Sequence, residues 1–178
     1  MELKPDAKRV YQVQSYGRSP MIDGVEIVEL RRHHDDGGSM TELARLEDGR
    51  LQGMSGFAVR QVNYSEIEPG VIKAFHVHLR QTDVWYVPPS DRVLVVLLDV
   101  RDDSRTEGVC MRITLGAGGS RLLRIPPGVA HGARNMAPTT GHIIYFTDLH
   151  FSTAPADCDE GRLPWDYAGA EVWEPHRG

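Results

Sequence analysis

The sequence predicts an all-β protein, and three observations support this prediction. The 178-residue chain contains 18 glycines and 11 prolines, and they fall between short apolar runs, as turn residues fall between strands. The 3.6-residue periodicity of an amphipathic helix is nearly absent. Short strands in close succession are typical of a β-sandwich or a β-barrel. We therefore expect one of these two architectures.

The apolar runs give the positions of the expected strands. In chain order, we expect strands at residues 25–31, 40–46, 56–63, 71–78, 84–87, 92–99, 109–114, 121–125 and 142–147. The run 93–98 is continuously apolar, which predicts a central strand that is buried on both faces. Turn residues gather before it at 88–91, and later at 116–119 and 137–140.

Length and composition favour a single domain. Hydrophobic residues make up 40% of the chain, which is enough to build one core. We expect one domain over residues 1–178, with an N-terminal extension at 1–24 and an aromatic C-terminal arm at 155–178. The arm contains Trp165 and Trp173, whose large apolar area can pack on the core of their own subunit.

Charge and cysteine content argue against several function classes. The net charge is −5 and the chain has no basic run, so nucleic acid is not expected as a partner. Cys110 and Cys158 lack the CxxC spacing of a zinc knuckle, and a reducing compartment is expected. Residues 1–15 are charged where a signal peptide is apolar, and no run approaches the roughly 18 apolar residues of a membrane span. We therefore expect a cytoplasmic protein with no membrane attachment.

Two histidines lie close together on the fourth expected strand. Because side chains alternate between the two faces of a strand, we expect His76 and His78 on one face together with Ile72 and Ala74. The same alternation places Lys73 on the opposite face. Two imidazoles that share a face can act on one ligand.

Two segments match motifs of the cupin superfamily. The segment GVIKAFHVHLRQTD holds His76, His78 and Asp83 at the spacing of the first motif, with Asp83 where glutamate is usual. The segment PPGVAHGARN holds His131 at the spacing of the second motif. The resemblance implies a double-stranded β-helix, the jelly-roll barrel of the cupins, which brings these side chains together at its mouth. Such a barrel offers a concave pocket to a small ligand.

This group of side chains is compatible with two chemistries. His76, His78, Asp83 and His131 together could hold a divalent transition metal ion with positions open to a substrate. Alternatively, one imidazole could act as a general base that a carboxylate orients, without any metal. The histidines could also be ordinary hydrogen-bonded groups of a strand face, with neither role.

A broader resemblance covers the chain from Arg60 to Pro175. It rests on the segments RQVNYS, PGVIKAFH, LDVRDDSRTEG and IPPGVAHG and on the pair Trp165-Asp166, and the DxRxxSxTxG pattern from Asp99 to Gly108 is its most specific part. In these segments the chain resembles the dTDP-4-dehydrorhamnose 3,5-epimerase family.

The resemblance implies cofactor-independent epimerisation of a dTDP-linked 4-keto-6-deoxy hexose. The C4 ketone acidifies the protons at C3 and C5, so a base can remove one and an acid on the opposite face can replace it. His76 matches the family's base, and Asp166 matches the carboxylate that pairs with this base. Tyr145 is the candidate for the opposing acid. Tyr145 matches the position of the family's acid only if the loop 137–140 is one residue longer than in the family pattern. Without this extra residue Ile144 occupies that position, and a shift of one residue moves a side chain to the other face of a strand.

The resemblance also implies substrate-binding residues and an oligomeric state. Gln61 and Asn63 match positions that contact the nucleotide sugar, Lys73 stands where the family has an arginine, and His131 lines the same pocket. We expect a homodimer in which strands near the N-terminus help to close the pocket. The resemblance also implies that the C-terminal arm packs near the active site of this dimer, which is the alternative to packing on the core of its own subunit.

Departures from the family pattern keep two alternatives open. His78 replaces a glutamine, Asp83 replaces a pocket lysine, and Gly37 replaces an arginine that grips phosphate. His78 and Asp83 are the residues that a metal-dependent cupin enzyme would have at these positions. The other alternative is a sugar-binding cupin without catalytic activity.

Overall fold

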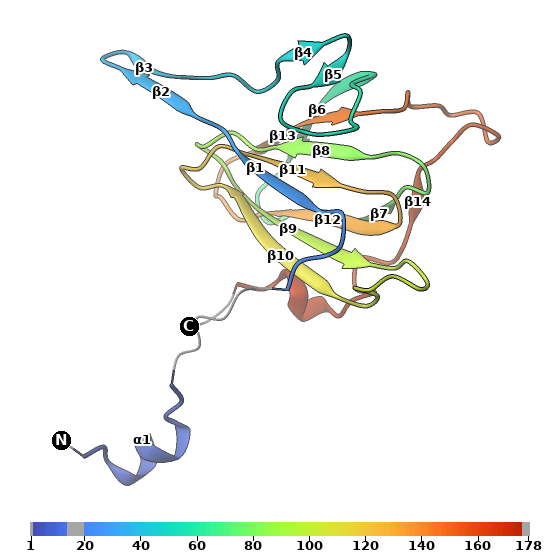
Figure 1. Cartoon of the computed structure of the whole chain (residues 1–178). Coiled ribbons are helices and arrows are strands. Elements are labelled where there is room, and N and C mark those ends of the chain that lie inside the picture. The colour runs from blue at the N-terminus through green and yellow to red at the C-terminus, as the bar shows by residue number, and fades with distance from the viewer. Residues whose placement is uncertain (1, 14–19, 176–178) are drawn as a thin grey trace.

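The protein is built around two five-stranded antiparallel β-sheets that face each other (Figure 1). The computed structural model describes residues 2–13 and 20–175. The first sheet, called the β8 sheet below, has the order β1 (Glu26–Glu29), β11 (Arg121–Ile125), β8 (Asp83–Tyr86), β13 (Gly141–Thr147) and β6 (Gln61–Ile67). The second, called the β9 sheet, has the order β10 (Cys110–Gly116), β9 (Arg92–Asp99), β12 (Val129–Asn135), β7 (Ile72–Val77) and β14 (Gly161–Arg162). The prediction of an all-β double-stranded β-helix is confirmed.

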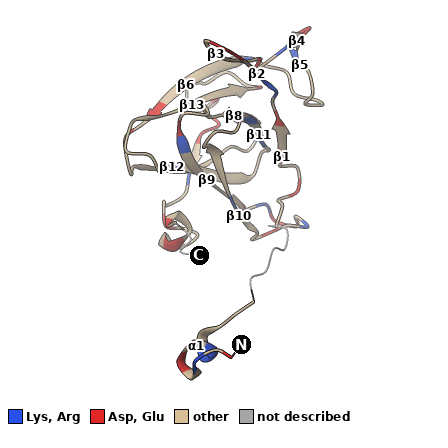
Figure 2. Ribbon diagram, turned by 90° about the vertical axis from the view of Figure 1, so that its left-hand side faces the viewer, with Lys and Arg blue, Asp and Glu red and all other residues tan. Residues whose placement is uncertain are grey.

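The remaining elements are short. Two hairpins, β2 (Arg32–Asp35) with β3 (Gly38–Thr41) and β4 (Leu46–Glu47) with β5 (Arg50–Leu51), follow β1. A helical turn, η1 (Ala170–Trp173), ends the described chain, and helix α1 (Pro5–Val10) begins it. Helix α1 has no buried residue and lies apart from the barrel (Figure 2). No helix in the described residues is both long enough and apolar enough to cross a membrane.

Strand β9 is the central strand that its apolar run predicts. It pairs with β10 on one side and β12 on the other, and its residues from Val93 to Asp99 are buried. Val95 and Leu97 belong to the core between the two sheets. Leu94 and Val96 pack on the outer face, where Trp173 covers them. The aromatic arm therefore packs on the core of its own subunit, with Trp173 at 0% exposure.

Several observed elements differ from the expected strands. Strand β12 was not expected, because its Gly132, Ala133 and Asn135 do not form the run of β-branched residues that marks a strand. Its Gly132 is needed for close packing, since a Cβ there would lie 2.3 Å from the Ala74 Cβ on β7. The expected strand 56–63 begins only at β6, and 40–46 is divided between the two hairpins.

A bulge in β7 changes which of its side chains share a face. His131 pairs with His76, whereas Ala133, two residues later on β12, pairs with Lys73, three residues earlier on β7. The extra residue on β7 interrupts the alternation. Lys73 therefore faces the same cavity as His76, whereas Ala74 packs in the cluster beneath Trp173. The alternation expected for this strand was therefore wrong at Lys73 and Ala74 and also at Ile72, which packs in the same cluster as Ala74.

The segment DxRxxSxTxG forms a closed polar network at the end of β9. Asp99 is 1% exposed, and it accepts hydrogen bonds from the Arg101 guanidinium at 2.8 Å, from Ser104 Oγ at 2.7 Å and from Thr106 Oγ1 at 2.6 Å. The Arg101 hydrogen bonds, with those of the two hydroxyls, hold the pKa of Asp99 far below its usual value. This network fixes the loop after β9, so its role is structural.

Candidate active site

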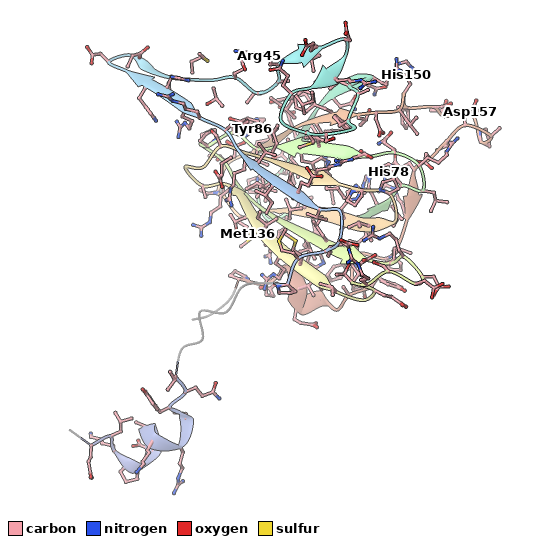
Figure 3. All side chains as sticks on the ribbon, viewed as in Figure 1. Arg45, His78, Tyr86, Met136, His150 and Asp157 are labelled. Atoms are coloured by element: carbon pink, nitrogen blue, oxygen red, sulfur yellow. The ribbon has the colours of Figure 1, made fainter. Side chains whose placement is uncertain are left out.

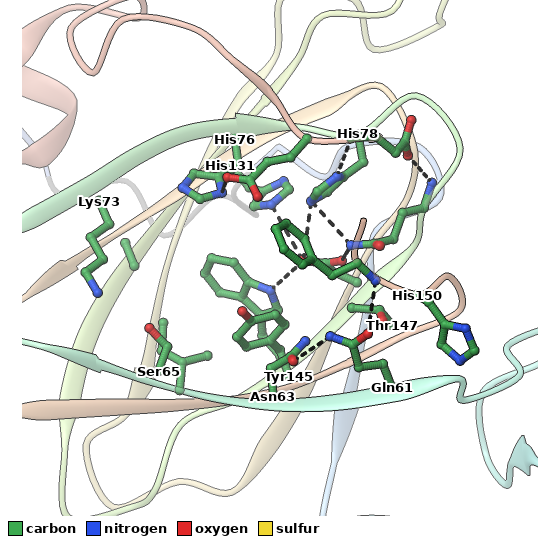
Figure 4. Close-up of a pocket in the computed structure, with 18 of the residues that line it drawn as sticks. Gln61, Asn63, Ser65, Lys73, His76, His78, His131, Tyr145, Thr147 and His150 are labelled. Carbon is green, nitrogen blue, oxygen red and sulfur yellow. Dashed lines mark hydrogen bonds and ion pairs between the residues drawn. The ribbon is translucent and has the colours of Figure 1, made fainter. Parts of the chain in front are cut away.

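A cavity of about 400 Å³ lies between the two sheets and opens at one end of the barrel (Figure 4). Strands β6, β8 and β13 line one side of the cavity, and β7 and β12 line the other. The connection from β13 to β14, which carries His150 and Asp157, lies at the same end of the barrel as His78 (Figure 3). The side chain of Asp159 fastens this connection by accepting the backbone N–H groups of Arg80 at 2.9 Å and Gln81 at 2.8 Å.

The cavity brings together the residues predicted from the sequence, with one exception. All the other predicted catalytic, substrate-binding and metal-ligating side chains line it, namely Gln61, Asn63, Lys73, His76, His78, Asp83, His131 and Tyr145. The exception is Asp166, which is exposed to solvent and is not part of the lining.

His76 lies on β7 with its imidazole at the wall of the cavity. Burial is the main cause that lowers its pKa to about 4, and the nearby His131 and Arg162 lower it further. The imidazole is therefore neutral at pH 7, which is the state that can accept a proton.

The carboxylate beside His76 is Glu160, so the predicted pairing with Asp166 has to be corrected. Glu160 Oε1 lies 3.5 Å from His76 Nδ1. Strand β14, which begins at the next residue, pairs with β7 and puts Arg162 opposite His76, and this register brings Glu160 over the imidazole. Glu160 carries no motif, and a two-residue strand that pairs with β7 leaves no pattern in the sequence by which it could be found.

Tyr145 faces the cavity from β13. It pairs with Trp85 on one side and Asn63 on the other, and it packs against the core between the sheets. Ile144 faces away, into the cluster around Val84 and Tyr86. Burial, together with the negative charges of Asp83 and Glu160, raises the pKa of the Tyr145 phenol. The phenol therefore keeps its proton at neutral pH.

His76 and Tyr145 lie on opposite walls of the cavity (Figure 4). His76 belongs to the β9 sheet, and Tyr145 belongs to the β8 sheet. A neutral imidazole on one wall and a protonated phenol on the other are a base and an acid that can reach the two faces of a bound ring.

Polar side chains of β6 continue the wall below Tyr145. Gln61 Nε2 donates to Asn63 Oδ1 at 2.7 Å, and Gln61 Oε1 accepts the Phe151 N–H at 3.0 Å. Lys73 is exposed at the rim, and its ammonium donates to the backbone carbonyl of Glu66 at 2.5 Å. The wall thus offers amide groups inside the cavity and a cation at its edge.

Three buried residues of the cavity lining, His78, Asp83 and His131, lie close together. One nitrogen of each histidine and one oxygen of Asp83 all lie within 4.8 Å of one another. His76 does not belong to this group, so the predicted four-residue metal set is reduced to three. Burial lowers the pKa of His131.

Comparisons with known proteins identify the family of the chain. The family model described as dTDP-4-dehydrorhamnose 3,5-epimerase matches residues 19–167. The spore coat polysaccharide biosynthesis protein SpsL of Bacillus subtilis is 42% identical over 146 residues, which cover 82% of this chain and 91% of SpsL.

Solved structures show the same likeness. The crystal structure of a dTDP sugar isomerase from Desulfovibrio desulfuricans G20 has a TM-score of 0.72 at 29% identity and covers 82% of this chain and 87% of its own. The structure of dTDP-4-dehydrorhamnose 3,5-epimerase from Bacillus anthracis with TDP and PPi bound has a TM-score of 0.67 at 26% identity and covers 80% of each chain. The chain therefore belongs to the dTDP-4-dehydrorhamnose 3,5-epimerase family, whose members are isomerases.

Proposed function

We propose that this protein epimerises a dTDP-linked 4-keto-6-deoxy hexose at C3, at C5 or at both. The observation that carries the proposal is the placement of His76 and Tyr145 on opposite walls of one cavity. Inversion of a carbon centre requires that a proton leave one face of the ring and return to the other, and two groups that face each other can do this.

His76 is the proposed base. The C4 ketone makes the neighbouring C–H bonds acidic, because the enolate that forms spreads its charge onto the ketone oxygen. Glu160 faces Nδ1 of His76, so an Nδ1–H directed at this carboxylate leaves the lone pair of Nε2 for the substrate proton. Glu160 also stabilises the imidazolium that forms. Glu160 is therefore proposed as a positioning residue in place of Asp166.

Tyr145 is the proposed acid. Its phenol is protonated at neutral pH and stands across the cavity from His76. It delivers its proton to the face of the enolate opposite to the one that His76 deprotonated, and the configuration of that carbon is inverted. These two transfers use side chains alone and need no redox or organic cofactor.

Gln61, Asn63 and Lys73 are proposed to bind the substrate, and His131 lines the same cavity. The amides of Gln61 and Asn63 can hydrogen-bond the sugar or the nucleotide, and Lys73 at the rim can contact phosphate. TDP and PPi bound to the Bacillus anthracis epimerase support a nucleotide as the second half of the ligand.

We also propose that the protein works as a homodimer in the cytoplasm. The β2–β3 hairpin extends beyond the barrel, where it can reach a second subunit (Figure 1). Cys110 and Cys158 are both free thiols, as a reducing compartment favours.

The test is solvent exchange into a dTDP-4-keto-6-deoxy hexose in D2O, followed by mass spectrometry. The wild-type protein is expected to incorporate deuterium at the carbons next to the ketone, and His76→Asn to lower the rate by about 10² to 10⁴-fold, as loss of a general base does. His33→Asn, on the exposed strand β2, is the matched control and should keep the wild-type rate. Undiminished exchange in His76→Asn would exclude this base, and substrate binding without exchange in the wild type would identify a sugar-binding protein instead.

A further inference from the structure

We propose that His78, Asp83 and His131 form a binding site for a divalent transition metal ion at the floor of the cavity. The site is distinct from the His76–Tyr145 pair, although both open into the same cavity (Figure 4). All three side chains are buried, with exposures of 9%, 3% and 2%.

The backbone fixes the tautomers of both histidines. His78 Nδ1 lies 2.7 Å from the carbonyl oxygen of Asp159, and His131 Nδ1 lies 3.0 Å from that of Val129. A carbonyl oxygen only accepts, so each Nδ1 carries the hydrogen and each Nε2 carries a lone pair. The two lone-pair nitrogens lie 3.9 Å and 3.7 Å from the same oxygen, Asp83 Oδ2.

This arrangement joins three electron-pair donors, and the Gln81 amide lies 3.4 Å from one of them, His78 Nε2. His131 Nε2 is buried and has no hydrogen-bond partner. Asp83 accepts hydrogen bonds from Gln81 Nε2 at 2.7 Å and Trp85 Nε1 at 3.0 Å, which are neutral groups. A buried carboxylate whose hydrogen-bond donors are neutral groups lacks a counter-charge, and such a charge is costly to bury. A cation bound by all three groups supplies the missing charge.

The geometry suits a transition metal. Ligand atoms about 2.0 to 2.2 Å from an ion are roughly 3 to 3.5 Å apart in tetrahedral or octahedral coordination. The two distances to Asp83 therefore have to shorten by less than about 1 Å, and the distance between the two imidazole nitrogens, which lie within 4.8 Å of each other, by at most about 1.8 Å. Two imidazoles and one carboxylate, with further positions open to a cavity, form a ligand set typical of divalent iron, cobalt, nickel or zinc.

The surroundings of the three ligands support the same conclusion. Histidines that bind metals donate their second ring N–H to a carbonyl or a carboxylate, and both histidines do so here. The Trp85 ring meets the His131 ring edge-on at 5.3 Å and holds its orientation. Trp85 and Gln81 orient the carboxylate in turn.

The ion gives the cavity a positive charge beside the proposed base. The His76 and His131 ring centroids are 6.0 Å apart, whereas the ammonium of Lys73 is at the rim. This consequence rests on the proposed function: the ion would stabilise the negative charge that develops on the ketone oxygen of the enolate. The metal site itself does not depend on it.

Titration of the chelator-treated protein with Co²⁺ tests the site without any substrate. We expect one equivalent to bind and to produce visible absorption bands of cobalt with nitrogen and oxygen ligands. Asp83→Asn and His78→Gln should each weaken binding by at least about 100-fold, since loss of an outer-shell partner alone costs 10 to 100-fold. Two variants keep the test decisive if one fails to fold, which circular dichroism will show.

Two controls separate this site from other binding modes. His33→Gln/His34→Gln removes a histidine pair on the exposed strand β2 and should leave binding unchanged. His76→Asn should also bind Co²⁺ as the wild type does while it loses deuterium exchange, so failure of the metal site and failure of the proposed base give different results. No Co²⁺ binding by the wild type, or binding that only the His33/His34 variant removes, would overturn the proposal. Weakening by His76→Asn equal to that of His78→Gln would replace it with a four-ligand site.

Discussion

Two aspartates of this protein are almost equally buried, and their surroundings differ in kind. Asp99, at 1% exposure, is bonded to a guanidinium and two hydroxyl groups. Asp83, at 3% exposure, has two neutral donors and faces two imidazole lone pairs. The charge of Asp99 is compensated by its hydrogen-bonding partners within the fold. The charge of Asp83 has no such compensation from its two neutral donors, and Asp83 lines a cavity from which a ligand can reach it. The comparison teaches that burial alone does not identify a functional carboxylate, and that its partners do.

Substitution of each of these two aspartates by asparagine should change the free energy of unfolding by clearly different amounts, and this is the largest difference that we expect. Asp99→Asn leaves Arg101 without its counter-ion and turns an amide N–H toward other donors, so we expect a loss of about 3 kcal/mol in the free energy of unfolding. Asp83→Asn in metal-free protein should lower this free energy by only about 1 kcal/mol, because the new amide N–H can donate to His131 Nε2 and partly offsets the lost hydrogen bond from Trp85 Nε1. Urea denaturation in the presence of a chelator measures both values. Equal losses would show that the two carboxylates do not differ as we describe.

Tyr145→Phe should affect the reaction and leave stability nearly unchanged. The ring keeps its packing against Trp85, but the acid is lost, so we expect epimerisation to slow by about 100-fold. Proton removal by His76 should continue, which predicts deuterium exchange without inversion. Nuclear magnetic resonance of the product in D2O distinguishes the two. Full epimerisation by this variant would assign the acid to another group.

Glu160→Gln should have a smaller effect on the same reaction. The glutamine can still hold the imidazole but cannot stabilise the imidazolium, so we expect kcat to fall about tenfold. The negative charge of Glu160 raises the pKa of His76, and its removal should move the acid limb of the pH profile to lower pH. Asp166→Asn, at an exposed position, is the matched control. A loss in the control instead of in Glu160→Gln would restore the pairing with Asp166.

The value of kcat/KM should change little with pH near neutrality, and this is the smallest effect that we expect. His76 must be neutral to act as a base, and its pKa is about 4, so activity should fall only as the pH drops through about 4. The raised pKa of Tyr145 keeps the acid protonated at neutral and mildly alkaline pH. Initial rates across the stable pH range measure the profile. Half-maximal activity near the ordinary histidine pKa of about 6.5 would contradict a desolvated His76.

Local patterns in the sequence were sufficient for much of the fold and part of the site. Strands β9 and β11 have the predicted bounds because turn residues precede their apolar residues, at 88–91 and 116–119. His76, His78 and His131 converge as their motifs predict. Tyr145 required the correct register on β13, which depends on one residue in the preceding loop.

The rest depended on pairing between distant segments. Lys73 shares the cavity with His76 because of a bulge opposite β12, and local alternation predicted the opposite face. Glu160 reaches His76 through a two-residue strand about 80 residues further along the chain. The separation of His76 from the His78–Asp83–His131 cluster is a matter of a few ångströms in three dimensions, which motif spacing does not encode.

A crystal structure of the complex with an unreactive dTDP-linked 6-deoxy hexose tests the central claim most directly. Our account predicts that the sugar ring lies between the two sheets, with His76 Nε2 at one face of C3 or C5 and the Tyr145 hydroxyl at the opposite face. A ring bound outside this cavity, or with both groups on the same face, would contradict it.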